Sequence, residues 1–343
     1  MRTRLSDDEL AVRDAFHGFF ENECPSSMVR HAGEANGFDR GLWDAVAAMG
    51  APGMALPESA GGADASLSDL AVVAEVAGAH LAPVPLIEHA VAARAIHRAG
   101  GYDDVVAELA AGSRIATLAL RPPVDGIARL VPAGAVADVV VSPSGTGLSL
   151  TQTSPDGERI PNTADLPLAD RDVRSASELT GDLDHQQQAL NEWRAVTAVA
   201  YVGLGQRAIE LGVAYAKERT QFDVLIGTFQ AIQHGYADAA TQLEGARLLS
   251  YRAVWAVETG QPDASRLAGM ALLFASQAAR FATDRSLQYH GGYGFSEEYD
   301  IQLYHRHATS WVLQLGDPSL ELARLADAEF GPRQSAPQNA GMI

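Results

Sequence analysis

Two short stretches in the C-terminal third carry residues able to hold a large ligand. In "ERTQFD", the guanidinium of Arg219 offers a fixed fork of donors to a phosphate, although an arginine near a helix end is by default a solvated charge. In "QYHGGYGF", Gly291 and Gly292 either end a helix or let a ligand approach the backbone. Gln230 and Gln288, one near each stretch, can both donate and accept hydrogen bonds.

The composition is that of a globular protein with a large excess of acidic residues. The chain has 343 residues, of which 47% are hydrophobic, enough for two or three domains. Its formal net charge of −18 argues against nucleic-acid binding, because phosphate contacts need clustered Lys and Arg. Cys24 is the single cysteine, which excludes an intrachain disulfide and favours a cytoplasmic location. We also expect no signal peptide and no membrane span, because no apolar run is long enough.

Residues 1–112 are expected to form an N-terminal helical domain. Ser6, followed by three acidic residues, has the pattern of a helix N-cap. Ser66 or Ser68 is expected to cap a later helix. Apolar residues at helical spacing predict further helices over Phe38–Met49, Ser66–His80, Pro85–Arg98 and Asp103–Ala111.

Residues 113–183 are expected to form a reduced middle β domain of four or five strands. The segments "RIATLAL", "ARLVPAG", "ADVVVSP" and "GLSLTQT" are short, rich in β-branched residues and separated by turn residues. The glycines of "SPSGTGLS" are followed by a strand pattern and not by a helix, so we interpret them as a hairpin turn and not as a phosphate loop.

Residues 184–330 are expected to form a C-terminal four-helix bundle, followed by a disordered tail over residues 331–343. Val196–Leu211 is apolar on nearly all sides and should be buried all round. Pro262 suits the first turn of a helix that runs to His290. The other predicted helices are Gln186–Arg219, Thr228–Thr259, Glu298–Val312 and Pro318–Phe330. The predicted fold is mainly α with a small β domain.

This layout and three motifs resemble the acyl-CoA dehydrogenase family across most of the chain. The motifs are "AMGAPGMALPESAGG", "YAKERTQFDVLIGTFQAIQHGYADA" and "LQYHGGYGFSEEYDIQLYHRHA". The last two lie about 60 residues apart in the order that the family shows. The resemblance implies the acyl-CoA dehydrogenase fold and FAD as cofactor.

In that family FAD lies at a subunit interface, where one chain holds the flavin ring and its neighbour holds the pyrophosphate and adenosine. The resemblance implies nine FAD-contacting residues in this chain. Those expected near the pyrophosphate are Arg219, Gln221 and Phe222. Those expected to flank it are Phe229, Gln230 and Ile232. Those expected to face the adenosine half are Gln288, Gly291 and Gly292.

The sequence departs from the family at positions that matter for catalysis. The segments that line the flavin ring in the family have no counterpart in the short β domain. Leu315 occupies the usual position of the catalytic Glu, and Trp193 occupies the alternative position before Arg194. Neither side chain can accept a proton. The remaining candidates for a base are Glu192, Asp317 and Glu321, each of which is by default a cap or a solvated charge. Asp223 replaces a glycine of the second motif, which leaves the local loop geometry open.

The pattern of retained and missing residues resembles most the short, base-lacking subunits of actinobacterial heterotetrameric (α2β2) acyl-CoA dehydrogenases of the steroid side-chain type. The resemblance implies three partners: a second dehydrogenase subunit that carries the base, an acyl-CoA substrate, and electron-transferring flavoprotein as acceptor. The apolar segments Val196–Leu211 and Ala268–Ala279 fit either a subunit core or packing within the chain. Two other readings stay open: a homo-oligomeric dehydrogenase with an atypical base, and a non-enzymatic scaffold.

Overall fold

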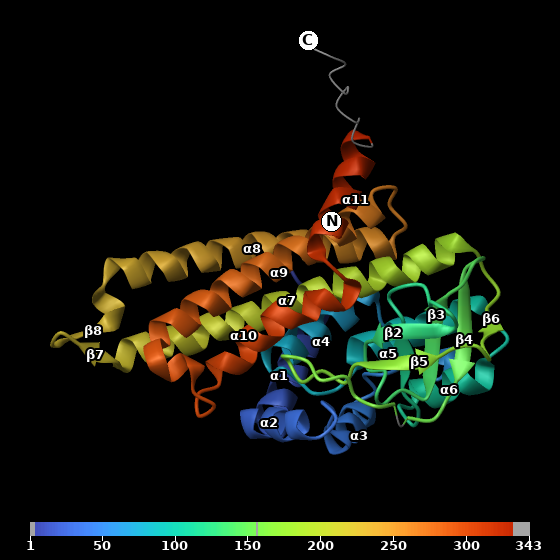
Figure 1. Cartoon of the computed structure of the whole chain (residues 1–343), viewed down its shortest axis with the longest axis horizontal. Helices are drawn as coiled ribbons and strands as arrows, with labels where there is room; N and C mark the ends of the chain where they lie inside the picture. The colour runs from blue at the N-terminus through green and yellow to red at the C-terminus, as the bar shows by residue number, and fades with distance from the viewer. Residues whose placement is uncertain (1–3, 156, 332–343) are drawn as a thin grey trace, which may run out of the picture.

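A helical N-terminal part, a small β region and a long helical bundle follow one another along the chain in the computed structural model (Figure 1). The structure describes residues 4–155 and 157–331. This arrangement confirms the predicted fold class. The predicted tail lies outside the described residues, apart from Gly331, which follows the last helix.

Local capping explains where the N-terminal helices begin. The N-terminal part contains α1 (Asp7–Glu23), α2 (Ser26–Glu34), α3 (Arg40–Ala48), η1 (Glu58–Ala60), α4 (Leu67–Ala79), α5 (Leu86–Ala99) and α6 (Asp103–Ala110). Ser6 and Ser66 each form a reciprocal capping box with the acid three residues later. Of the two serines considered as caps for α4, Ser66 is therefore the one used. The short helix α2 was not predicted; Pro25 precedes it and provides no side-chain cap.

Within the described part of the chain, the β region has six strands, one more than the upper number predicted. Its strands are β1 (Ala116–Leu118), β2 (Ile127–Val131), β3 (Val139–Pro143), β4 (Leu148–Gln152), β5 (Ala169–Asp172) and β6 (Ser177–Glu178). One sheet has the order β1-β3-β4-β6, and β2 pairs with β5 separately. Strands β3 and β4 are antiparallel, with Pro143 opposite Leu148, so "SPSGTGLS" forms the predicted hairpin turn.

Long antiparallel helices form the C-terminal bundle. Its elements are α7 (Leu183–Glu218), β7 (Thr220–Gln221), β8 (Val224–Leu225), η2 (Ile226–Thr228), α8 (Gln230–Glu258), α9 (Ala264–His290), η3 (Gly291–Phe295), α10 (Ile301–Ser310), η4 (Trp311–Leu315) and α11 (Pro318–Phe330). Pro262 does not lie in the first turn of α9, because the helix begins after Asp263 and the proline belongs to the preceding turn. None of the described helices combines the length and apolar character needed to cross a bilayer.

Helix α7 joins the bundle to the N-terminal part, and its central section is buried by this chain alone. It packs against α4, α5, α8 and α9, and residues 191–205 are buried. The prediction that Val196–Leu211 is buried all round is wrong after Gly205, because Gln206, Arg207 and Glu210 are exposed. Since residues 191–205 and most of 268–279 are covered within the chain, their apolar character needs no subunit core to explain it.

Candidate functional site

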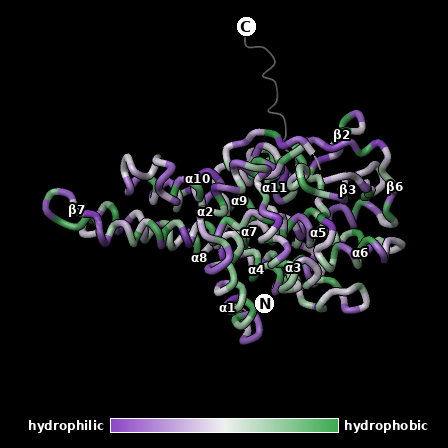
Figure 2. The backbone as a smooth tube through the Cα atoms, turned by 90° about the horizontal axis from the view of Figure 1, so that it is seen from below, coloured by the Kyte–Doolittle hydropathy of each residue, from purple (hydrophilic) through white to green (hydrophobic). Residues whose placement is uncertain are grey.

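A hairpin that extends beyond the end of the bundle carries the first group of predicted ligand-binding residues (Figures 1 and 2). Arg219 caps α7, and strands β7 and β8 follow it. The turn residues Phe222 and Asp223 have positive φ angles of 55° and 63°. Two-residue hairpin turns commonly require this conformation, which an aspartate tolerates better than a bulky residue. Asp223 thus adopts the turn conformation at the position where the family has glycine. Phe222, beside it, is 89% exposed.

Five of the nine predicted residues line one open depression at this end of the bundle. They are Arg219, Gln221, Gln288, Gly291 and Gly292. The depression has a volume of about 550 Å³. Its other walls come from the ends of α7 and α9 and from η3, so segments about 70 residues apart in the sequence meet here.

The guanidinium of Arg219 is placed by an aromatic ring. Its Cζ atom lies 5.7 Å from the centre of the Tyr293 ring, within range of a cation–π contact. Among the described residues Arg219 forms no ion pair with a carboxylate, so its charge is available to an anion. The depression therefore has one positioned cation with free donors.

The end of α9 confirms one reading of the paired glycines. Gly291 caps α9 with φ of 63°, a conformation that favours glycine, so it ends the helix. A Cβ atom on Gly291 or Gly292 would meet no atom of this chain within 4 Å, so the backbone here faces open space. The neighbouring His290 is stacked on Tyr215 at 4.2 Å between ring centres, and its Nδ1–H donates to the Ser286 carbonyl at 2.6 Å.

The remaining four predicted residues lie outside the lining of the depression. Phe222 and Phe229 contact each other edge to face at 6.4 Å between ring centres. Gln230 is exposed on the first turn of α8. Ile232 is half-buried against the hydrophobic core, which explains its apolar character without a ligand.

The two usual base positions hold side chains that are part of the packing. Trp193 is fully buried, and Leu315 is half-buried against the core. The indole Nε1–H of Trp193 donates to Oε1 of Glu88 at 3.4 Å. Glu88 lies in the first turn of α5, where an acid is expected to interact with the helix dipole. Glu88 was therefore not predicted as a site residue, although the apolar segments "PLI" before it and "AVAA" after His89 indicate burial.

Each substitute base considered from the sequence has a structural partner. Glu192 is buried and forms ion pairs with Arg94 at 3.2 Å and Arg98 at 2.7 Å. Asp317 caps α11 by accepting from the Ser319 backbone N–H at 2.8 Å, a hydrogen bond that lowers the pKa of its carboxyl.

Glu321 is held by two arginines. It pairs with Arg194 at 3.0 Å and with Arg324 at 2.8 Å. Burial opposes ionisation of its carboxyl, but the hydrogen bonds and charges of the two arginines outweigh it and lower its pKa. Carboxylates held in this way are poor proton acceptors at neutral pH.

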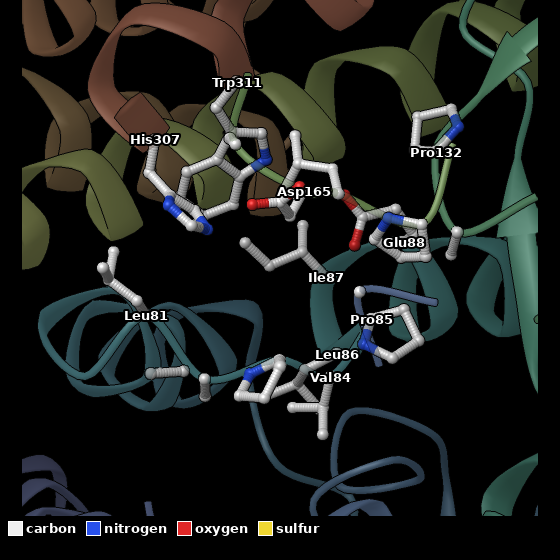
Figure 3. A pocket seen from close by; sticks show the side chains of 18 of the residues that line it. Leu81, Val84, Pro85, Leu86, Ile87, Glu88, Pro132, Asp165, His307 and Trp311 are labelled. Atoms are coloured by element: carbon white, nitrogen blue, oxygen red, sulfur yellow. The ribbon is translucent and has the colours of Figure 1, made fainter. Parts of the chain in front are cut away.

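A second cavity lies between the start of α5, the loop at residues 164–168 and the α10–η4 segment (Figure 3). Glu88 and Trp311 line it, and Leu315 immediately follows another lining residue, Gln314. Burial raises the pKa of the Glu88 carboxyl above its ordinary value. Burial thus disfavours the charged form of the carboxyl that accepts from Trp193.

Comparisons with known proteins agree with this architecture. Models of the acyl-CoA dehydrogenase N-terminal and C-terminal domains match residues 6–103 and 183–322. The acyl-CoA dehydrogenase IpdE2 of Mycolicibacterium smegmatis is 31% identical over 95% of this chain and 100% of its own length. IpdE2 of Mycobacterium tuberculosis is 32% identical over 88% of this chain and 93% of its own.

Two solved structures share the fold. The steroid ACAD Tcur3481-Tcur3483 superimposes with a TM-score of 0.85 and 29% identity, over 94% of this chain and 98% of that chain. A chain of the ChsE4-ChsE5 complex of Mycobacterium tuberculosis superimposes with a TM-score of 0.84, over 97% of this chain and 100% of that chain. Because the two sequences are only 22% identical, this likeness shows the shared fold alone. The matching domains and the full-length relatives place this chain in the acyl-CoA dehydrogenase family.

Proposed function

We propose that the chain is the non-catalytic subunit of a heteromeric, FAD-dependent acyl-CoA dehydrogenase. In this proposal its residues bind the pyrophosphate and adenosine of an FAD molecule, and the partner subunit binds the flavin ring of the same molecule. The observation that carries this proposal is the contrast between two regions. Arg219, Gln288 and Gly291 meet in an open depression, whereas the base positions hold Leu315 and Trp193.

The residues present in the depression fit the nucleotide end of FAD. Arg219 would hold the pyrophosphate, because its fork of donors matches phosphate oxygens and its position is supported by Tyr293. Gln221 and Gln288 would hydrogen-bond ribose or amide groups. Gly291 and Gly292 leave the backbone open to a second molecule. The exposed ring of Phe222 would be covered by the same partner.

Bound FAD would supply the hydride acceptor for α,β-dehydrogenation of the acyl-CoA. The residues of this chain would orient the nucleotide end and keep the hairpin against the partner. Removal of the α proton falls to a carboxylate of the partner subunit, because Glu192, Asp317 and Glu321 are engaged in ion pairs or capping. A positioned base commonly contributes about 10²–10⁴-fold to the rate, so a chain without one depends on its partner for turnover.

Similar proteins support a proposed acyl group and partner. Tcur3481-Tcur3483, which is 29% identical to this chain, is a steroid ACAD. This supports a steroid side-chain CoA thioester as substrate and a second dehydrogenase subunit as partner. Electron-transferring flavoprotein is proposed as the electron acceptor.

Co-expression with candidate dehydrogenase subunits tests the proposal. We expect a complex that contains FAD and oxidises an acyl-CoA, and a colourless, inactive chain when it is expressed alone. Arg219→Ala should weaken FAD binding to the complex about 10- to 150-fold, the range for a hydrogen bond to a charged group. The matched control is Arg129→Ala, which removes an exposed arginine from β2 and should leave the flavin content unchanged.

The same experiment separates the two alternatives. Yellow colour and turnover by the chain alone would favour a homo-oligomeric dehydrogenase with an atypical base. A stable complex whose flavin content is insensitive to Arg219→Ala would favour a scaffold and refute the half-site.

A further inference from the structure

One buried side chain on the lining of the bundle-end depression carries an acceptor that no group of this chain fills. His290 is 5% exposed and lines the depression. Its Nδ1–H donates to the Ser286 carbonyl at 2.6 Å, and because a carbonyl oxygen can only accept, the proton of the neutral ring lies on Nδ1. Nε2 therefore presents a lone pair, and it has no hydrogen-bond partner among the described residues.

This lone pair is accessible and is held in one direction. The unpaired polar atoms that the described residues enclose completely do not include Nε2 of His290, so a ligand can reach this atom. Tyr215 stacks on the imidazole at 4.2 Å between ring centres, and Tyr299 meets it edge to face at 5.9 Å. Together with the Nδ1 hydrogen bond, these two contacts fix the rotation of the ring. An acceptor that is fixed before binding loses little conformational entropy when a ligand arrives.

The other side-chain acceptors on the lining are less suited to the same role. Gln221, Gln288 and Glu298 are exposed, so each would lose rotamer freedom on binding a ligand. An ionised Glu298 would also repel the phosphates that Arg219 attracts. The imidazole of His290 avoids this repulsion, because burial lowers its pKa and favours the neutral ring.

We propose that His290 is a further ligand-contacting residue of the half-site, in which Nε2 accepts a hydrogen bond from the adenosine part of the bound dinucleotide. This inference rests on the proposed function, in which the depression holds the nucleotide end of FAD. Adenosine has donors of two kinds, the ribose hydroxyls and the 6-amino group, and either kind would satisfy Nε2.

A titration of the full chain with ADP tests the contact. ADP carries the phosphates and the adenosine, and its affinity is measured by calorimetry for the natural chain and for His290→Phe. This substitution keeps a flat ring beside Tyr215 and removes the acceptor. We expect it to weaken ADP binding about 3- to 10-fold, as expected for one hydrogen bond. His31→Phe, at an exposed position of α2, is the matched control and should leave the affinity unchanged.

Three analogues of ADP identify the donor. They are 2′-deoxy-ADP, 3′-deoxy-ADP and purine riboside 5′-diphosphate, which lacks the 6-amino group. The analogue without the contacted donor should bind the natural chain about 3- to 10-fold more weakly than ADP, and His290→Phe should weaken its binding no further. Losses that add up independently for all three analogues would overturn the proposal.

Two further variants keep the test decisive. Circular dichroism establishes that each variant is folded, and His290→Asn, whose amide can still donate to the Ser286 carbonyl, replaces His290→Phe if the latter is not. If Arg219→Ala weakens ADP binding and His290→Phe does not, the His290 contact alone is wrong. ADP binding that is insensitive to Arg219→Ala would refute the half-site itself. Absence of saturable ADP binding would also overturn the contact, while the flavin content of the co-expressed complex would still decide the half-site.

Discussion

A single added methyl group at the crossing of α4 and α7 should separate the two helices. A Cβ atom on Gly203 of α7 would lie 1.9 Å from the backbone oxygen of Glu75. In the opposite direction, a Cβ atom on Gly78 of α4 would lie 2.2 Å from the backbone oxygen of Ala200. Both obstacles are backbone atoms, so no side-chain rotation relieves them. The two glycines therefore allow the N-terminal part and the bundle to pack at backbone distance.

The size of the effect follows from these distances. Ordinary contact begins at 3.4 Å, so Gly203→Ala requires a local displacement of about 3.4 − 1.9 = 1.5 Å. Overpacking a core costs about 1–3 kcal/mol, and separating the helices also removes contacts of their buried neighbours. Replacing glycine by alanine in a helix returns about 1 kcal/mol of propensity. The overpacking and propensity terms together leave a loss of about 0–2 kcal/mol, to which the lost contacts add, so we expect Gly203→Ala to lower the free energy of unfolding by about 1–2 kcal/mol or more.

The assay is urea-induced unfolding followed by circular dichroism and tryptophan fluorescence. The control is Gly18→Ala in α1, where an added Cβ meets no atom within 4 Å. This variant gains only helix propensity and should be about 0.5–1 kcal/mol more stable than the natural chain. Replacing glycine by alanine should thus lower the free energy of unfolding at Gly203 and raise it at Gly18. If the two variants differed by less than about 0.5 kcal/mol, the argument from close helix packing would be refuted.

Two further predictions concern buried carboxyls. Glu192→Gln leaves Arg94 and Arg98 without their carboxylate and should lower unfolding free energy by about 3 kcal/mol, while turnover of the co-expressed complex is unchanged. Lost turnover with unchanged stability would instead identify Glu192 as a base. Burial raises the pKa of Glu88, so ionisation of this carboxyl costs the folded state more free energy as the pH rises. Glu88→Gln removes that cost. It should therefore raise the melting temperature most near about pH 8 and progressively less toward about pH 4.5. Equal gains at both ends of this range would contradict that assignment.

The sequence determined much of the secondary structure because the deciding interactions are local. The capping boxes at Ser6 and Ser66 join residues three apart, and the β3–β4 hairpin joins adjacent strands. Where local signals were weak, prediction failed. Helix α2 has no side-chain N-cap, and its short length gives few repeats of the apolar pattern. The tertiary structure decided that residues 191–205 of α7 are covered by their own chain, which the apolar run alone left open.

From the sequence we also predicted which residues form a nucleotide half-site, because their motifs are contiguous around the ends of α7 and α9. Only the tertiary structure brought Arg219 over Tyr293 and placed Trp193 against Glu88, which is 105 residues away. It also showed that Glu192 is neutralised by arginines of α5. The charge state of a buried group depends on atoms from several distant segments, because the group loses its water only after those segments have packed around it.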